Sequence, residues 1–360
     1  MNMIGKIATS LIWVFWMMSV SAVEGQVTSE YNPTYGSTFD RVNKRGYVVC
    51  GTNGEFPGFS REDWNMEDGS RWEGFDVDIC RAIAAAMFGD AEAIEFTIVN
   101  GKTRFEFLID GSIDILSAAT TYTFTRNVAK KLEFMPTTFY DGQGFIVRKT
   151  LGVSSAKQME GARICFSGTG TAAKNIADFM ELHGISYIPV AVKSTEKTKN
   201  VYKRGDCDMY GTDRSGLASN RLSFDDPDRH MILPEIISKE PLGPVVRYGD
   251  QKWSDVIRWT VYVLFIAEEM GINSQNIDSF KNNIDPNIQR FMGEKNGKDH
   301  PHLGAKLGLG ATWSYNIIKQ VGNYREIYER NVGENTSLGL KRGLNRLYNH
   351  GGLLYAPPLK

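Results

Sequence analysis

Residues 74–89, GFDVDICRAIAAAMFG, have the apolar spacing of an amphipathic helix that ends in glycine. A short β-branched run, GYVVCGT at 46–52, precedes this helix, and a second strand candidate, IEFTIV at 94–99, follows it. The alternation continues with a predicted helix at 104–108 and a predicted strand at 112–118. Strands that alternate with helices predict βαβ units and a parallel sheet.

The same pattern begins again in the second half of the chain. ARICFSGTGTAAKNIADFMELHG, residues 162–184, runs from a strand through a glycine turn into a helix. SYIPVAV at 186–192, a helix over 195–204 and CDMYGT at 207–212 follow it. The sequence therefore predicts an α/β protein with two lobes, each a mostly parallel sheet flanked by helices.

Two extended, glycine-containing stretches separate the halves, FYDGQGFIVRK at 139–149 and ILPEIISKEPLGPVVRY at 232–248. Because they flank one lobe, we expect the chain to leave the first lobe, build the second and return. Paired crossovers of this kind can act as a hinge. The predicted boundaries are 36–143 and 243–360 for lobe I, 144–242 for lobe II, and hinge strands near 139–147 and 233–246.

The returning chain is predicted to be helical. Residues 253–271, WSDVIRWTVYVLFIAEEMG, have helical apolar spacing around a short apolar centre, which indicates a buried helix. A last helical region is expected to hold GNYREIYERNV at 322–332 and LGLKRGLNRLYNHGG at 338–352.

The N-terminal residues resemble an export signal. Lys6 precedes an apolar run over 7–20, and small residues follow it, so we expect a signal peptide over 1–22 that is cleaved near Ala22. A membrane anchor is the alternative, but the run is shorter than the ~20 residues that span a bilayer. We therefore expect an exported, soluble mature protein. The chain has 41 Lys and Arg against 42 Asp and Glu, which argues against a nucleic-acid partner.

Export to an oxidising compartment favours disulfides among the four cysteines. Four cysteines allow three pairings. We favour Cys50 with Cys80 and Cys165 with Cys207, because these pairs close local loops within each half. Four buried free thiols are the alternative.

No catalytic, metal-binding or cofactor-binding motif occurs in the sequence, but two stretches suggest an anion site. ATTYTFTR at 119–126 places several hydroxyls ahead of Arg126; either a threonine caps a helix, or the hydroxyls and the guanidinium converge on an anion. SGTGTAAK at 167–174 lacks the Gly-Lys-Ser/Thr of a phosphate loop. It predicts instead a strand-to-helix turn whose free N–H groups face a small anion.

Four motifs carry a family resemblance: WEGFDVDICRAIAAAMFG, GSIDILSAATTYTFTR, SGTGT and CDMYGTDRSGL. In order and spacing they resemble periplasmic solute-binding proteins of family 3, which deliver polar amino acids to ABC importers. ILPEIISKEPLGPVVRYGDQKW and the C-terminal GNYREIYERN and GLLYAPP make the chain similar to the general L-amino-acid-binding branch. The resemblance implies a type II periplasmic binding protein fold, a free L-amino acid as ligand, inner-membrane permease subunits as partners, no cofactor and a monomer.

The resemblance also implies roles for individual residues. Arg126 would grip the ligand α-carboxylate, with Thr121 as a hydroxyl partner, and Thr169 would contact the same carboxylate from the second lobe. Asp213 would hold the α-ammonium, and Phe56 would form a wall for the side chain. The alternatives are that Asp213 caps a helix, that Arg126 lies on the surface, that Phe56 is core, and that the threonines form turns.

The sequence departs from the family pattern at three positions. The family usually carries bulkier polar residues where this chain has Ala118 and Ala119, and a threonine where it has Gly170. At Gly170 a backbone N–H remains but a hydroxyl is lost. We therefore expect a roomier pocket that accepts a larger or modified amino acid or a small peptide.

Two other functions remain open from the sequence. An arogenate or prephenate dehydratase is similar in fold and would need a general acid, for which Glu55 is the one nearby candidate. A partner that presents its ligand to a chemotaxis receptor is the other.

Overall fold

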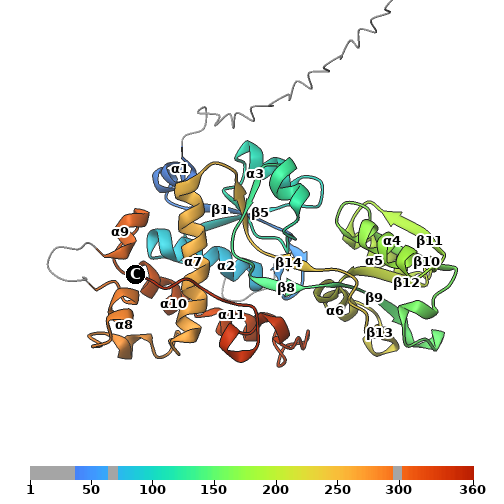
Figure 1. The fold of residues 1–360 in the computed structure, drawn as a ribbon. Helices are drawn as coiled ribbons and strands as arrows, with labels where there is room; N and C mark the ends of the chain where they lie inside the picture. The colour runs from blue at the N-terminus through green and yellow to red at the C-terminus, as the bar shows by residue number, and fades with distance from the viewer. Residues whose placement is uncertain (1–36, 64–71, 295–301) are drawn as a thin grey trace, which may run out of the picture. The chain divides into compact units, whose positions relative to one another are not determined.

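The computed structural model describes residues 37–63, 72–294 and 302–360 (Figure 1). The expected signal peptide, residues 1–22, lies outside this part of the chain. Within the described ranges, no helix has both the length and the apolar character needed to cross a membrane.

The first sheet has five strands in the order β5-β1-β6-β15-β7. Its strands are β1 (Val48–Thr52), β5 (Ile94–Ile98), β6 (Ile115–Leu116), β7 (Leu132–Phe134) and β15 (Val245–Arg247). β1 pairs in parallel with β5 and β6, whereas β15, from the returning chain, is antiparallel to β6 and β7. We call this sheet and the helices packed on it the first lobe.

Helices cover both faces of the first sheet. α2 (Phe75–Phe88) is buried against β1, α7 (Gln251–Glu269) and α10 (Trp313–Gln320), over the largest apolar core. α3 (Arg104–Asp110) packs on β1, β6 and β15 over a separate core. The remaining helices of this lobe are α1 (Thr38–Arg45), α8 (Pro286–Phe291), α9 (Leu303–Leu307) and α11 (Tyr324–Asn331).

The second sheet also has five strands, in the order β11-β10-β12-β9-β13. They are β9 (Gln143–Arg148), β10 (Ala162–Ser167), β11 (Tyr187–Val192), β12 (Met209–Asp213) and β13 (His230–Ile232). Side chains alternate between the two faces, as a strand requires: Phe145 of β9 faces the core under α4 (Ala172–Leu182), and Ile146 faces the core under α5 (Thr195–Lys203) and α6 (Arg214–Leu222). This sheet and its helices are the second lobe.

Short antiparallel strands join the lobes. β8 (Phe139–Asp141) pairs with β14 (Glu240–Leu242), and both lie within the two stretches predicted as crossovers. The lobe boundaries and hinge strands given above stay predictions. A small three-stranded sheet, β2 (Glu55–Phe56), β3 (Ser60–Glu62) and β4 (Trp72–Glu73), belongs to the first lobe.

Each lobe contains one disulfide, in the pairing favoured from the sequence. Cys50 of β1 is bonded to Cys80 of α2, and Cys165 of β10 is bonded to Cys207, just before β12. Each bond therefore joins a central strand to an element of the same lobe.

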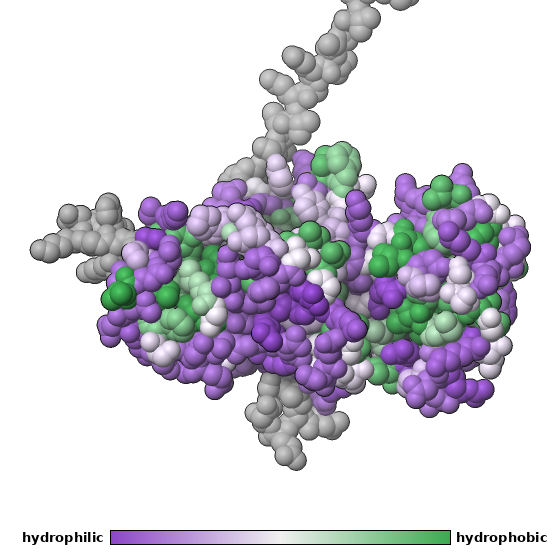
Figure 2. Space-filling model, turned by 60° about the horizontal axis from the view of Figure 1, so that its bottom comes forward, coloured by the Kyte–Doolittle hydropathy of each residue, from purple (hydrophilic) through white to green (hydrophobic). Residues whose placement is uncertain are grey.

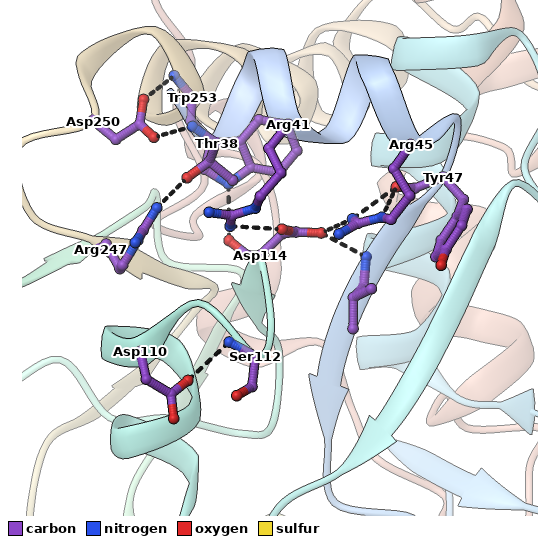
Figure 3. Close-up of polar contacts among 11 residues, drawn as sticks. Thr38, Arg41, Arg45, Tyr47, Asp110, Ser112, Asp114, Arg247, Asp250 and Trp253 are labelled. Atoms are coloured by element: carbon purple, nitrogen blue, oxygen red, sulfur yellow. Dashed lines mark hydrogen bonds and ion pairs between the residues drawn. The ribbon is translucent and has the colours of Figure 1, made fainter. Parts of the chain in front are cut away.

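Asp114 anchors the N-terminal helix of the described chain (Figure 3). Its buried carboxylate accepts hydrogen bonds from Arg41 and Arg45 of α1 and from the Val49 N–H at 2.8 Å. Its carbonyl accepts one from the Trp253 indole at 2.9 Å. One residue thus ties α1, β1 and α7 together at the start of β6.

The C-terminal segment differs from the sequence prediction in one place. Residues 324–331 form α11 as expected, but the stretch predicted as helical at 338–352 forms only two 3-10 turns, Gly343–Asn345 and Tyr348–His350. Gly339, Gly343 and Gly351 have positive φ angles, which a continuous α-helix does not allow.

The face of the molecule in Figure 2 is largely hydrophilic, with hydrophobic side chains in small groups.

Candidate functional site

The structure buries Arg126 directly after the hydroxyl-rich stretch. Arg126 lies in a one-turn π-helix, Thr125–Ala129, and only 8% of it is exposed, so it is not a surface arginine. Its backbone N–H donates to the Thr123 hydroxyl at 3.3 Å, and its Nη1 donates to the Thr121 carbonyl at 2.7 Å. Thr123 therefore bonds the first turn of the π-helix, and the Arg126 guanidinium is nevertheless buried.

A second arginine, Arg104 at the start of α3, lies beside Arg126; the sequence analysis did not single it out. Its Nη1 lies 3.4 Å from the Thr120 hydroxyl, and its buried Nε has no hydrogen-bond partner. The guanidinium carbons of Arg104 and Arg126 lie 4.7 and 5.5 Å from the centre of the Phe105 ring. Burial, and then the charge of Arg126, lower the pKa of Arg104 to about 9. Within the described ranges, neither arginine forms an ion pair.

Asp213 occupies the junction of β12 and α6 in the second lobe. It is the residue before the first turn of α6, but its side chain makes no capping hydrogen bond. Asp141 takes that role, since its Oδ2 accepts from the Ser215 N–H at 3.1 Å while its Oδ1 accepts from the Gly142 N–H at 2.8 Å. The alternative that Asp213 caps the helix is therefore wrong. No donor in the described part of the chain bonds to the Asp213 carboxylate.

Electrostatics link Asp213 with the two arginines. Burial raises the pKa of Asp213 well above its usual value, and the charges of Asp141 and Glu240 raise it further, while Arg126 and Arg104 oppose the shift. Burial likewise lowers the pKa of Arg126, against the charges of Glu240 and Asp213. Asp213 and the two arginines therefore lie near enough that the charge of one affects the pKa of another, and we treat them as one candidate site.

Glu240 differs from Asp213 in being held by the protein itself. It is 1% exposed, and its Oε1 accepts from the Asn175 amide at 2.7 Å and from the Ser238 hydroxyl at 2.8 Å. Asp213 is thus the carboxylate of this group with free acceptor capacity.

Thr169 lies in the turn between β10 and α4, where it meets the first lobe. Its hydroxyl lies 3.0 Å from the Ser167 hydroxyl. A Cβ added to Gly101, between β5 and α3, would lie only 2.4 Å from the Thr169 hydroxyl oxygen. A Cβ on the neighbouring Gly170 would meet nothing within 4 Å. The lobes thus touch at Thr169, beside open space at Gly170.

Phe56 provides a second point of approach between the lobes. Its half-buried ring stacks on Phe59 with the ring centres 4.6 Å apart. A Cβ added to Gly216, in the first turn of α6, would lie 3.9 Å from the tip of the Phe56 ring. Phe56 therefore packs on the core and also reaches the helix that follows Asp213.

The segment that carries Thr121 is fixed by α2. Asp76, in the first turn of α2, accepts from the Ser117 hydroxyl at 3.0 Å and from the Ala119 N–H at 2.9 Å. Ala119 has a φ of 42°, in the left-handed region. Thr121 is buried and forms an isolated antiparallel β-bridge with Leu242 of β14. α2 therefore positions the residues that precede Arg126.

Glu55, the candidate general acid, lies exposed on β2. It therefore lies outside the group of buried side chains around Arg126.

Residues 48–334 match the family model of the bacterial extracellular solute-binding proteins, family 3, and the chain belongs to this family. It is 46% identical to the general L-amino acid-binding periplasmic protein AapJ of Rhizobium johnstonii, over 90% of this chain and 93% of that protein. It is 42% identical to the glutamate/glutamine/aspartate/asparagine-binding protein BztA of Rhodobacter capsulatus, over 90% and 94%.

A solved structure matches almost the whole chain. The periplasmic binding protein of an ABC transporter from Brucella ovis, with glutathione bound, is 42% identical and has a TM-score of 0.86, over 91% of this chain and 100% of that one. The family and these relatives are solute-binding proteins, so the chain is a solute-binding protein and not a dehydratase.

Proposed function

We propose that this protein binds an amino acid, or a small peptide that keeps a free α-carboxylate and α-ammonium on one residue, between its two lobes. Arg126 binds the α-carboxylate from the first lobe, with Thr121 beside it and with Thr169 and the Gly170 N–H facing it from the second lobe. Asp213 binds the α-ammonium. Phe56 and Ala119 border the side chain.

One observation carries this proposal: Arg126, which is buried, and Asp213, which makes no capping hydrogen bond, have no ionic partner among the described residues. Burial shifts the pKa of both groups toward the neutral form. Keeping a guanidinium and a carboxylate out of water without partners is costly. A zwitterion supplies the missing partner to both. Because only the closed arrangement offers both partners, the ligand favours closure.

The small residues at the site favour a ligand larger than a standard amino acid. Gly170 has no neighbour within 4 Å of its Cβ position, and positions 118 and 119 hold only alanines. The relative from Brucella ovis holds glutathione, a tripeptide whose γ-linked glutamate keeps a free α-carboxylate and α-ammonium. We expect this chain to accept ligands of that kind as well as polar amino acids.

The cellular setting is part of the same proposal. The matched relatives are periplasmic proteins, and the sequence of residues 1–22 is typical of a signal peptide. The protein would act as a periplasmic monomer that delivers its ligand to inner-membrane permease subunits.

Isothermal titration calorimetry with the twenty amino acids and reduced glutathione tests the proposal. Charge-assisted bonds are worth roughly 1.5–3 kcal/mol each, so Arg126→Met and Asp213→Asn should each weaken binding by at least about tenfold. The matched control is Arg163→Met, which breaks a partly exposed 2.8 Å ion pair with Asp208 outside the site and should leave affinity unchanged. Wild-type affinity in both site variants would disprove the assignment.

A further inference from the structure

The strand that leads into the second lobe, β8, has one edge that no other strand covers. In the described part of the chain β8 pairs with β14 alone, and its middle residue, Tyr140, lies opposite Pro241. Proline has no N–H, so the Tyr140 carbonyl cannot accept a hydrogen bond from it. The backbone groups of Tyr140 therefore need partners beyond the other edge of β8.

The C-terminal segment supplies both partners. Asn345 is 4% exposed; its Oδ1 accepts from the Tyr140 N–H at 2.6 Å, and its Nδ2 donates to the Tyr140 carbonyl at 3.1 Å. One side-chain amide thus makes the two hydrogen bonds that a residue of a further antiparallel strand would make. Asn345 lies beyond residues 48–334, the range that the family model matches.

Asn345 is itself fixed to the first lobe. The Arg342 Nε donates to the Asn345 carbonyl at 2.8 Å. The other two nitrogens of that guanidinium bond the two carboxylate oxygens of Glu268, on α7, at 3.0 and 3.1 Å. Both side chains of this ion pair are largely buried, and a bidentate pair holds a defined geometry. Through Asn345, Tyr140 is therefore attached to the first lobe.

The two residues that follow Tyr140 are bonded to the second lobe. The Asp141 carboxylate accepts from the Ser215 N–H at 3.1 Å, and the Gly142 carbonyl accepts from the Arg214 N–H at 2.9 Å. Both donors lie in the first turn of α6. Along this strand the attachment thus changes from the first lobe to the second directly after Tyr140.

Building on the proposed function, we propose that Asn345 is a positioning residue for ligand binding, which fixes the first-lobe end of the hinge strand β8. With Tyr140 held, closure needs dihedral changes only at the few residues that follow it. Without Asn345, the backbone of Tyr140 would be free in the ligand-free protein and would have to be ordered when the lobes close. Ordering the backbone of one residue lowers a binding constant by about 5- to 30-fold. Because Asn345 acts through β8, the affinity for every ligand falls by the same factor.

Calorimetry of Asn345→Leu, which loses both hydrogen bonds at similar side-chain size, tests this inference. Its affinities for polar amino acids and reduced glutathione should lie about 5- to 30-fold below those of wild type, in unchanged ratios to one another. Asn345→Ala, the smaller replacement, should give the same pattern. The matched control is Gln320→Leu, which should bind like wild type. The Gln320 amide also bonds a backbone N–H and a backbone carbonyl, those of Ala91 at 2.8 Å and Gly89 at 2.7 Å, but within the first lobe.

Hydrogen exchange of the ligand-free protein separates this role from a general loss of stability. In Asn345→Leu the amides of residues 139–142 should exchange at least about fivefold faster, and the amides elsewhere in both lobes at the wild-type rate. Faster exchange throughout the first lobe, unequal losses of affinity among the ligands, or wild-type affinity in both Asn345 variants would each overturn the inference and leave the proposed function intact. If wild type binds no amino acid or peptide, the proposed function fails, whereas the exchange pattern still decides whether Asn345 fixes β8.

Discussion

The contact between Gly101 and Thr169 makes a sharp prediction for lobe closure. An alanine Cβ at 101 would lie 2.4 Å from the Thr169 hydroxyl oxygen and 3.0 Å from its Cβ, where ordinary contacts are 3.4–4 Å. Either the Thr169 side chain must rotate and lose its 3.0 Å contact with the Ser167 hydroxyl, or the two loops must part, and overpacking of this kind costs roughly 1–3 kcal/mol. We therefore expect Gly101→Ala to weaken ligand binding by about 5- to 150-fold.

The cost should fall on closure and not on folding, because the clash lies between loops of different lobes. Calorimetry should show weaker binding, while the urea midpoint of the ligand-free protein stays near that of wild type. Gly310→Ala is the control, since this exposed glycine lies outside the site and its Cβ meets nothing within 4 Å. Thr169→Ala should lower the affinity less in the Gly101→Ala background than in wild type, because there it also removes the atoms that clash with the added Cβ. Wild-type affinity of Gly101→Ala would refute the reasoning.

Three further predictions concern stability, each measured by urea denaturation. Asp114→Asn should cost about 3 kcal/mol, because it removes the buried carboxylate that binds two arginines; a loss below 1 kcal/mol would contradict the anchoring role. Ala119→Gly should gain about 0.5–1 kcal/mol by relieving a φ of 42°, whereas Ala118→Gly, at a position without positive φ, should destabilise. Burial raises the pKa of Asp76 from 3.8 to about 6, so the folded state binds the extra proton and stability falls by roughly 3 kcal/mol as pH rises through that window. Asp76→Asn should lack this slope, and parallel pH curves for variant and wild type would contradict it.

The spacing of apolar residues predicted most of the fold, because it indicates which side chains are buried. The strand at 46–52 and the helix at 74–89 appear as β1 (Val48–Thr52) and α2 (Phe75–Phe88). The helix predicted at 338–352 was wrong because Gly339 and Gly343 take positive φ angles that apolar spacing does not reveal.

The site was harder to read from the sequence than the fold. Arg104 opens an ordinary amphipathic helix, so nothing local shows that its guanidinium is buried without a partner. Asp213 stands at a capping position, and the sequence does not show that Asp141, far away on β8, performs the capping. Both properties depend on residues that only the folded chain brings together.

The two disulfides have a consequence for export and motion. Each closes its ring inside one lobe, so each lobe can complete its oxidative folding without waiting for the other. Since neither disulfide crosses from one lobe to the other, oxidation can stiffen both lobes without restricting the motion between them. A reducing agent should therefore lower the stability of each lobe and leave the range of lobe opening and closing unchanged.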